Sequence, residues 1–378
     1  MFFDVLSNND SCKARTGIIK TPHSEIETPV FMPIGTTGTV KAITNRDIEE
    51  FDTRIILANT YHLYLRPGVE ILENAGGLHK FMNWNNSILT DSGGFQIFSL
   101  STLRKITDEG VEFSSHLDGS THFFTPERII DIERVIGSDI VMCLDECLEN
   151  PSERKKAEDS LKTTSKWEKR CLEHFNNTNP LYGNEQFIFA ICQGSTYEDL
   201  RKMHISEMTQ LDFAGFAIGG LAVGEESSVM YDIVDLSTDN LPLNKPRYLM
   251  GVGTPVDILE CVEKGIDMFD CVIPTRNARH GRLFTTYGEI NLKNSSLKFN
   301  FNSPDEECKT YTSENFSLAY LRHLFISKEI LGMQLATIHN LGFYLKLMKD
   351  IRNAIRENNF LNFKNEFLQK YLSNKFKI

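Results

Sequence analysis

Eight short apolar runs recur along this 378-residue chain, and each ends in a polar residue or a glycine. The runs are continuous rather than alternating, which is typical of parallel strands buried on both faces. They span residues 30–35, 55–59, 88–91, 140–145, 187–193, 216–220, 248–251 and 268–272. Helix-like stretches lie between most of them, at residues 45–51, 125–136, 151–176, 196–210 and 255–264. Eight strands alternating with helices predict an α/β fold, the (β/α)8 TIM barrel.

A doubly wound open sheet is the alternative, but no glycine fingerprint opens the first strand–helix turn. Two insertions interrupt the repeat. Residues 108–124, with Asp118-Gly119 between extended runs, predict a hairpin, and residues 292–317 predict a small excursion before the last helices. We therefore divide the chain into a barrel core (1–291), a small C-terminal subdomain (292–340) and basic C-terminal helices (341–378).

The composition, 41% hydrophobic and 24% charged, is that of an ordinary globular protein. No stretch of eighteen uncharged apolar residues occurs, so we expect no membrane partner. An acid at Asp4 stands where a signal peptide carries positive charge, which argues against export. Eight cysteines scattered through apolar runs are typical of reduced core residues in a cytoplasmic protein.

The net charge of −11 argues against nonspecific coating of nucleic acid. From His339 onward, however, eight Lys or Arg face three acidic residues, so the C-terminal part is basic. This asymmetry indicates either contact with a polyanion or a solvated amphipathic helix.

Polar side chains follow the predicted strands at the end where a TIM barrel places its chemistry. Asp91 and Asp270 suit displacement at the anomeric carbon of a sugar, in which one carboxylate forms a covalent glycosyl intermediate and the other handles protons. Asp145 and the amide of Gln193 offer acceptors and donors for the edge of a flat heterocycle, and Phe95 offers a stacking face. For any single aspartate the structural alternative is a cap on the next helix.

Asp270 is followed by a segment in which Pro274 and Asn277 predict a loop. Arg276 and Arg279 in this segment could hold a phosphate or a base edge through their forked donors. A surface ion-pair network at the end of a core strand is the structural alternative.

Four motifs together resemble the bacterial tRNA-guanine transglycosylases: residues 90–96 (TDSGGFQ), 144–147 (LDEC), 219–225 (GGLAVGE) and 274–279 (PTRNAR). The resemblance extends from about residue 28 to residue 355. It implies a TIM-barrel enzyme of queuosine biosynthesis that replaces guanine at the tRNA wobble position by a 7-deazaguanine. The implied partners are a tRNA with a guanine wobble base, the free base and a second copy of the chain. A base flipped out of a single-stranded anticodon loop fits such a barrel mouth.

The resemblance implies that Asp270 is the nucleophile that holds the ribose and that Asp91 is the general base or acid. Base binding would fall to Ser92, Gly93, Gly94, Phe95, Asp145, Gln193, Gly220, Leu221 and Met250. Contacts to flanking RNA would fall to Gly251, Val252, Gly253, Thr254, Thr275, Arg276, Asn277, Ala278 and Arg279.

The family binds structural zinc through a Cys-x-Cys-x-x-Cys motif and a later histidine, and this chain departs from that pattern. Cys308 and His339 remain, but Thr310 and Ser313 stand where two thiolates would be. Hydroxyls are poor zinc ligands, and two ligands cannot close a tetrahedral site. We therefore predict no cofactor, with the zinc lost or weakly held.

Two other functions remain open from the residues: a retaining glycoside hydrolase on a barrel, and a noncatalytic tRNA-binding subunit. The incoming base is open as well. Cys147 and Val223 match the bacterial pattern, which goes with the small aminomethyl base, whereas queuine is the bulkier alternative.

Overall fold

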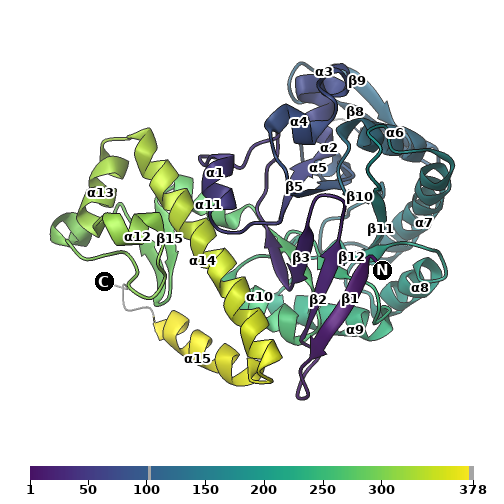
Figure 1. Ribbon diagram of the computed structural model, residues 1–378. Coiled ribbons are helices and arrows are strands. Elements are labelled where there is room, and N and C mark those ends of the chain that lie inside the picture. The colour runs from purple at the N-terminus through teal and green to yellow at the C-terminus, as the bar shows by residue number, and fades with distance from the viewer. Residues whose placement is uncertain (101–103, 374–378) are drawn as a thin grey trace.

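The computed structural model describes residues 1–100 and 104–373, and its centre is a barrel of eight parallel strands (Figure 1). Each strand lies on one of the eight predicted apolar runs. The strands are β4 (Val30–Met32), β5 (Ile55–Asn59), β6 (Ser87–Asp91), β10 (Ile140–Met142), β11 (Phe187–Cys192), β12 (Gly215–Ile218), β13 (Arg247–Leu249) and β14 (Met268–Asp270).

The barrel is closed by a contact between its first two strands in the chain. The sheet order is β4-β14-β13-β12-β11-β10-β6-β5, and a parallel bridge joins Ile34 to Leu57 across the remaining gap. The Leu57 N–H donates to the Pro33 carbonyl at 3.0 Å, and the Gly35 N–H donates to the Leu57 carbonyl at 2.6 Å. This closure confirms the predicted TIM barrel and excludes the open sheet.

Helices surround the barrel (Figure 1). They are α1 (Asn45–Glu49), α2 (Thr60–Leu63), the π-helical turn η1 (Tyr64–Gly68), α3 (Val69–Ala75), α4 (Leu78–Met82), α5 (Gly94–Leu100), α6 (Pro126–Ile136), α7 (Arg154–Asn177), α8 (Glu198–Met208), α9 (Ser227–Asn240), α10 (Pro255–Glu263) and α11 (Ile273–Arg279). The five predicted helices correspond to α1, α6, α7, α8 and α10. Helix α6 begins as its sequence predicts, because the Thr125 hydroxyl accepts the Arg128 N–H and Pro126 occupies the first turn.

A three-stranded antiparallel sheet covers the N-terminal end of the barrel. It consists of β1 (Phe3–Asn8), β2 (Arg15–Lys20) and β3 (Glu25–Thr28). Ile19 and Ile26 of this sheet pack in one core with barrel residues such as Leu89 and Ile191. This end of the barrel is therefore filled by side chains, which leaves the opposite end for a ligand.

The predicted insertion after β6 is a three-stranded antiparallel sheet: β7 (Arg104–Thr107), β8 (Gly110–Ser114) and β9 (Thr121–Phe124). The β8–β9 pair with its turn at Asp118-Gly119 confirms the predicted hairpin. The sequence interpretation missed β7, which adds a third strand to it.

The C-terminal part has a small hydrophobic core of its own, to which Leu283, Leu297 and Leu321 belong. Its elements are β15 (Arg282–Thr285), β16 (Gly288–Asn291), the 3-10 helix η2 (Ser295–Phe299), α12 (Tyr311–Asn315), α13 (Leu318–Ile326), α14 (Ile330–Arg356) and α15 (Phe360–Ser373). Helix α14 crosses the predicted boundary at residue 340 and returns to the barrel, where Tyr344 packs on Phe31 of β4 with ring centroids 4.9 Å apart.

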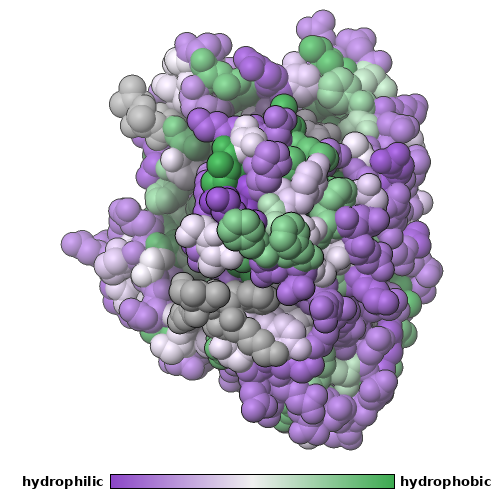
Figure 2. Space-filling view, turned by 90° about the vertical axis from the view of Figure 1, so that its left-hand side faces the viewer, coloured by the Kyte–Doolittle hydropathy of each residue, from purple (hydrophilic) through white to green (hydrophobic). Residues whose placement is uncertain are grey.

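Aromatic side chains gather on the outside of this C-terminal part. Phe299 and Phe301 are 76% and 74% exposed, and the rings of Tyr311, Phe316 and Tyr320 contact one another in sequence. Figure 2 shows the face on which α12 and α13 lie, with hydrophobic side chains among hydrophilic ones. We call these five residues the aromatic surface.

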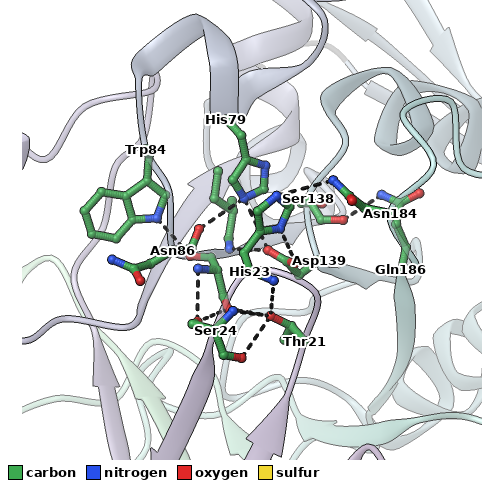
Figure 3. Close-up of polar contacts among 12 residues, drawn as sticks. Thr21, His23, Ser24, His79, Trp84, Asn86, Ser138, Asp139, Asn184 and Gln186 are labelled. Atoms are coloured by element: carbon green, nitrogen blue, oxygen red, sulfur yellow. Dashed lines mark hydrogen bonds and ion pairs between the residues drawn. The ribbon is translucent and has the colours of Figure 1, made fainter.

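At the N-terminal end of the barrel strands, His23 and His79 share the buried carboxylate of Asp139 (Figure 3). His23 Nδ1 lies 2.7 Å from one carboxylate oxygen, and His79 Nε2 lies 3.3 Å from the other and 3.1 Å from the Asn86 carbonyl. The imidazole rings are stacked, with centroids 3.8 Å apart and 14° between their planes. Two parallel, stacked rings cannot direct in-plane lone pairs at one ion, so we interpret this cluster as hydrogen bonds that hold the β2–β3 turn to the barrel rather than as a metal site.

No helix within residues 1–100 and 104–373 has the length and apolar character needed to cross a membrane. All eight cysteines are free thiols, and seven of them are buried.

Candidate active site

Asp91 is the last residue of β6 and lies at the open end of the barrel. One carboxylate oxygen accepts the N–H groups of Thr60 at 3.1 Å and Gly93 at 3.2 Å, and the Asn59 amide donates to the other oxygen. Burial raises the pKa of Asp91 to about 6, and the nearby charge of Asp270 acts in the same direction against these hydrogen bonds. A carboxyl group with this pKa can both give and take a proton near neutrality.

Asp270 is the last residue of β14. Its Oδ1 accepts the Tyr248 hydroxyl at 2.6 Å and the Gly251 N–H at 2.8 Å. Burial raises the pKa of Asp270, and these two hydrogen bonds oppose the rise by stabilising the anion. One carboxylate oxygen is thus held by two donors, which orients the side chain.

One cavity of about 620 Å³ brings the two carboxylates together with most of the predicted binding residues. The predicted residues that line it are Asp91, Ser92, Gly93, Phe95, Asp145, Gln193, Gly220, Leu221, Met250, Gly251, Asp270, Thr275, Arg276 and Arg279. The predicted residues outside this lining are Gly94, Val252, Gly253, Thr254, Asn277 and Ala278. The volume is in the range of small-molecule sites.

Asp145 and Gln193 form the polar floor that the sequence predicts. Gln193 Nε2 donates to Asp145 Oδ2 at 2.7 Å, and the Ser92 hydroxyl donates to Oδ1 at 3.2 Å. Burial raises the pKa of Asp145 to about 7, so this carboxyl group is poised between donor and acceptor forms at neutrality.

Two glycines let this polar floor pack closely. A Cβ atom on Gly94 would lie 2.6 Å from the Asp145 carbonyl oxygen, and one on Gly220 would lie 2.3 Å from Gln193 Oε1. Gly220 also has a φ of +64°, which disfavours any larger residue. Gly94 therefore contributes to the site by close packing even though it is outside the cavity lining.

The segment after Asp270 is helix α11, so the prediction of a loop there is wrong. Pro274 lies in the first turn, where a helix needs no N–H donor, and the Arg276 N–H donates to the Val272 carbonyl at 2.8 Å. The short helix presents Arg276 and Arg279 to the cavity.

Arg279 carries a cation that the protein itself leaves incompletely paired. Its Nη1 atom is buried and has no hydrogen-bond partner among the described residues. Burial lowers the pKa of Arg279, and the neighbouring charge of Arg276 lowers it further. An anionic group of a ligand would satisfy both guanidinium groups.

Several predicted RNA contacts have structural tasks. Val252 and Ala278 are buried in hydrophobic cores, and the Thr254 hydroxyl caps α10 by accepting the Asp257 N–H at 3.1 Å. Phe95, the predicted stacking wall, is 49% exposed on α5 and lines the cavity.

The sequence interpretation missed a supporting layer under the two carboxylates. Glu133 of α6 is fully buried, and it accepts hydrogen bonds from the hydroxyls of Thr60 and Thr90, which flank the Asp91 region. Burial raises the pKa of Glu133 to about 8. The sequence interpretation also missed Tyr248, which orients Asp270. Tyr248 lies within an apolar run, and its role could be recognised only from the direction of its side chain, into the barrel.

At the four positions of the family zinc motif, the side chains make hydrogen bonds among themselves and to the backbone. Ser313 and Thr310 cap α12 reciprocally, since each hydroxyl accepts the other residue's N–H, at 2.8 and 3.1 Å. His339 Nε2 donates to the Phe284 carbonyl at 2.8 Å, and Nδ1 faces the Thr310 hydroxyl at 3.3 Å. Burial lowers the pKa of His339, and burial raises the pKa of Cys308 to about 12, so the only thiol of the set is held neutral. The donor set therefore does not fit Zn²⁺.

Comparison with known proteins shows similarity over nearly the whole chain. A family model described as queuine tRNA-ribosyltransferase matches residues 10–373. The queuine tRNA-ribosyltransferase of Caldanaerobacter subterraneus subsp. tengcongensis is 55% identical over 373 residues, which cover 99% of this chain and 98% of that protein. The proteins of the same name from Thermoanaerobacter sp. and Aquifex aeolicus are 54% and 51% identical, over 98% and 95% of this chain and 97% and 96% of those proteins.

Proposed function

The chain belongs to the queuine tRNA-ribosyltransferase family and is a pentosyltransferase that acts on tRNA, and we propose that it works by double displacement through a covalent ribosyl–Asp270 intermediate. Guanine at the anticodon wobble position would be exchanged for a 7-deazaguanine in queuosine biosynthesis. One observation carries this proposal: the cavity holds two buried carboxylates, Asp91 and Asp270, in different hydrogen-bond environments.

In the first displacement, a carboxylate oxygen of Asp270 attacks C1′ of the wobble nucleotide. The C1′–N9 bond breaks, its electron pair leaves with guanine, and Asp91 supplies the proton that neutralises the leaving base. The Tyr248 hydroxyl and the Gly251 N–H hold Oδ1 of Asp270, which orients the carboxylate for the attack.

In the second displacement, Asp91 takes the proton from the corresponding nitrogen of the incoming base. That nitrogen bonds to C1′, and the ester to Asp270 breaks to regenerate the carboxylate, so atoms and charges balance. Asp145 and Gln193 would read the hydrogen-bonding edge of each base, and Phe95 and Met250 would contact its faces. A pKa of about 6 suits Asp91 to both proton transfers.

The cations of α11 support RNA as the substrate. Arg276 and Arg279 line the same cavity as the carboxylates, and the unpaired Nη1 of Arg279 suits a phosphate oxygen of the flanking nucleotides. A neutral polysaccharide offers no such anion, which favours the transferase over a hydrolase of neutral glycosides. A noncatalytic subunit has no use for the paired carboxylates.

For the incoming base, we propose the aminomethyl-substituted 7-deazaguanine over queuine. Cys147 and Val223 both line the cavity, as Leu221 does. Competition between the two bases for incorporation into tRNA distinguishes them, and preference for queuine would overturn this choice.

Labelled guanine incorporation into tRNA tests the exchange, and D270N tests the intermediate. We expect D270N to lose exchange entirely while tRNA binding stays near the wild-type level, because Asn cannot attack C1′. With an anticodon stem-loop and no second base, wild type should yield a protein–RNA adduct on a denaturing gel, and D270N should not. D232N, a change at an exposed aspartate of α9, serves as control. Exchange without any adduct, or an active D270N, would contradict the mechanism.

We further propose that the protein is a homodimer and that it folds without zinc. The aromatic surface supports the first statement, because four of its rings, those of Phe299, Phe301, Tyr311 and Tyr320, are exposed and a second copy of the chain would cover them. The hydrogen-bonded set around Thr310 and His339 supports the second.

A further inference from the structure

Two polar side chains that the mechanism does not use lie buried near the polar floor that Asp145 and Gln193 form. Glu168 of α7 and His204 of α8 are both 0% exposed. Glu168 Oε2 and His204 Nε2 face each other at 3.3 Å, within ion-pair distance, and neither atom has a hydrogen-bond partner among the described residues. A buried polar pair of this kind costs stability unless each group is satisfied, which calls for an explanation.

The backbone fixes the proton positions in this pair. The Gln193 N–H donates to His204 Nδ1 at 3.0 Å, so Nδ1 carries a lone pair and the ring proton lies on Nε2, facing Glu168. The other carboxylate oxygen of Glu168 accepts the Ile191 N–H. One oxygen of Glu168 thus faces a backbone N–H and the other faces the N–H of the His204 ring.

The pair is joined by hydrogen bonds to the polar floor of Asp145 and Gln193. His204 holds the backbone of Gln193, and the side chain of Gln193 donates to Asp145 at 2.7 Å. Arg201, on the same helix as His204, donates to the carbonyls of Cys192 and Ser195, both at 2.7 Å. Helix α8 therefore forms hydrogen bonds with the backbone of Gln193 and with the backbone on both sides of it.

We propose that Glu168 and His204 are positioning residues for base recognition, which act by fixing Gln193 so that its amide orients the carboxyl group of Asp145. This inference rests on the proposed function, since it concerns recognition of the exchanged base. After burial, the charge of Glu168 is also one of the causes that raise the pKa of Asp145. The pair thus bears on both the position and the proton affinity of Asp145.

The test separates base recognition from general packing of α7 against α8. In E168Q, the new amide group would point a donor at His204 Nε2–H, so the contact breaks with little change in volume. E207Q is the matched control, because Glu207 joins the same two helices through Ser165 at 3.0 Å and Lys169 at 2.6 Å without reaching β11.

With saturating tRNA, we expect E168Q to raise KM for guanine about tenfold, because Gln193 is no longer held in place to bind the base, while kcat changes much less. E207Q should behave as wild type. H204N can still provide an acceptor for the Gln193 N–H, whereas H204L provides a side chain of similar size without an acceptor. The KM for guanine should therefore be lower in H204N than in H204L. A wild-type KM in both E168Q and H204L, or an equal rise in E207Q, would overturn the proposal.

Hydrogen exchange gives a readout that needs no activity. The amide of Gln193 should exchange faster in E168Q and H204L than in wild type and E207Q, because its acceptor is displaced or lost. Unchanged exchange would overturn the positioning role even if E168Q proved unstable in assays. Absence of guanine incorporation by wild type would instead contradict the proposed function.

Discussion

At the scale of single residues, the site is a set of carboxyl groups that hold protons more tightly than they would in water. Burial raises the pKa of Asp91 to about 6, of Asp145 to about 7 and of Glu133 to about 8. Each of these groups also accepts hydrogen bonds, which fix the orientation of its side chain. Such groups cost folding free energy, which is tolerable where chemistry requires them.

For Asp91, the cost appears as a stability change with pH. The folded-state pKa of about 6 lies above the usual aspartate pKa of 3.8, so the folded protein binds a proton more tightly than the unfolded chain. Stability therefore falls as pH rises from about 4 to about 6, and the penalty persists above that range. D91N removes the charge, so we expect up to about 3 kcal/mol higher stability at pH 8 and little difference at pH 4, with base exchange lost. Urea unfolding at both pH values measures this. An equally large gain at pH 4 would show that the charge is not its cause.

At the scale of elements, the C-terminal subdomain is held by side-chain hydrogen bonds where the family pattern places a metal. Thr310 and Ser313 cap α12, and His339 of α14 joins Thr310 to β15 through the Phe284 carbonyl. These contacts are individually worth about 1 kcal/mol, so the packed core around Leu321 carries most of the stability of the subdomain.

Substituting cysteines for Thr310 and Ser313 should restore the metal site of the family pattern. T310C/S313C restores three cysteines and one histidine at the four positions, and we expect it to bind one zinc per chain with a tetrahedral thiolate signature under cobalt substitution. S313C alone should bind weakly, and the wild-type protein should hold almost none after chelator dialysis. Metal analysis together with thermal melting measures this. One tightly held zinc in the wild-type protein would contradict the proposal.

At the scale of the whole molecule, the charge asymmetry of the chain is largely absorbed by folding. Lys364 reaches Glu260 and Glu263 at 2.6 and 2.5 Å, and Lys370 reaches Glu307 at 3.0 Å. Arg352 and Arg356 both pair with Glu27, and Lys346 pairs with Asp350. Lys375 and Lys377 lie outside the described residues. Four of the eight basic residues, Arg352, Arg356, Lys364 and Lys370, therefore join α14 and α15 to other parts of the chain. The arginines of α11 indicate a polyanion contact independently of them.

The proposed homodimer belongs to this scale as well. Y320A/F316A removes two stacked rings from the aromatic surface, and we expect the variant to sediment as a monomer where wild type sediments as a dimer. L372A, at a 64% exposed leucine of α15, is the control and should leave the dimer intact. A monomeric wild type, or a Y320A/F316A variant that remains dimeric, would contradict this role of the aromatic surface.

Much of the architecture and the cavity lining could be predicted from the sequence. Continuous apolar runs report strands buried on both faces, and eight of them with polar ends place Asp91, Asp145 and Asp270 on one rim. The error at α11 arose because Pro274 was read as a breaker, whereas a proline in the first turn of a helix loses no hydrogen bond.

Local patterns in the chain were sufficient to predict the barrel, the hairpin insertion and the position of the two carboxylates at the ends of strands. Backbone periodicity and strand ends depend on only a few neighbouring residues. The supporting layer was not accessible in this way. Glu168 meets the Ile191 N–H across 23 positions, and Thr90 meets Glu133 across 43. Such pairs exist only once the barrel has closed, since closure brings together side chains whose spacing along the chain carries no period. Burial, which sets the proton affinities of the site, likewise arises from that closure.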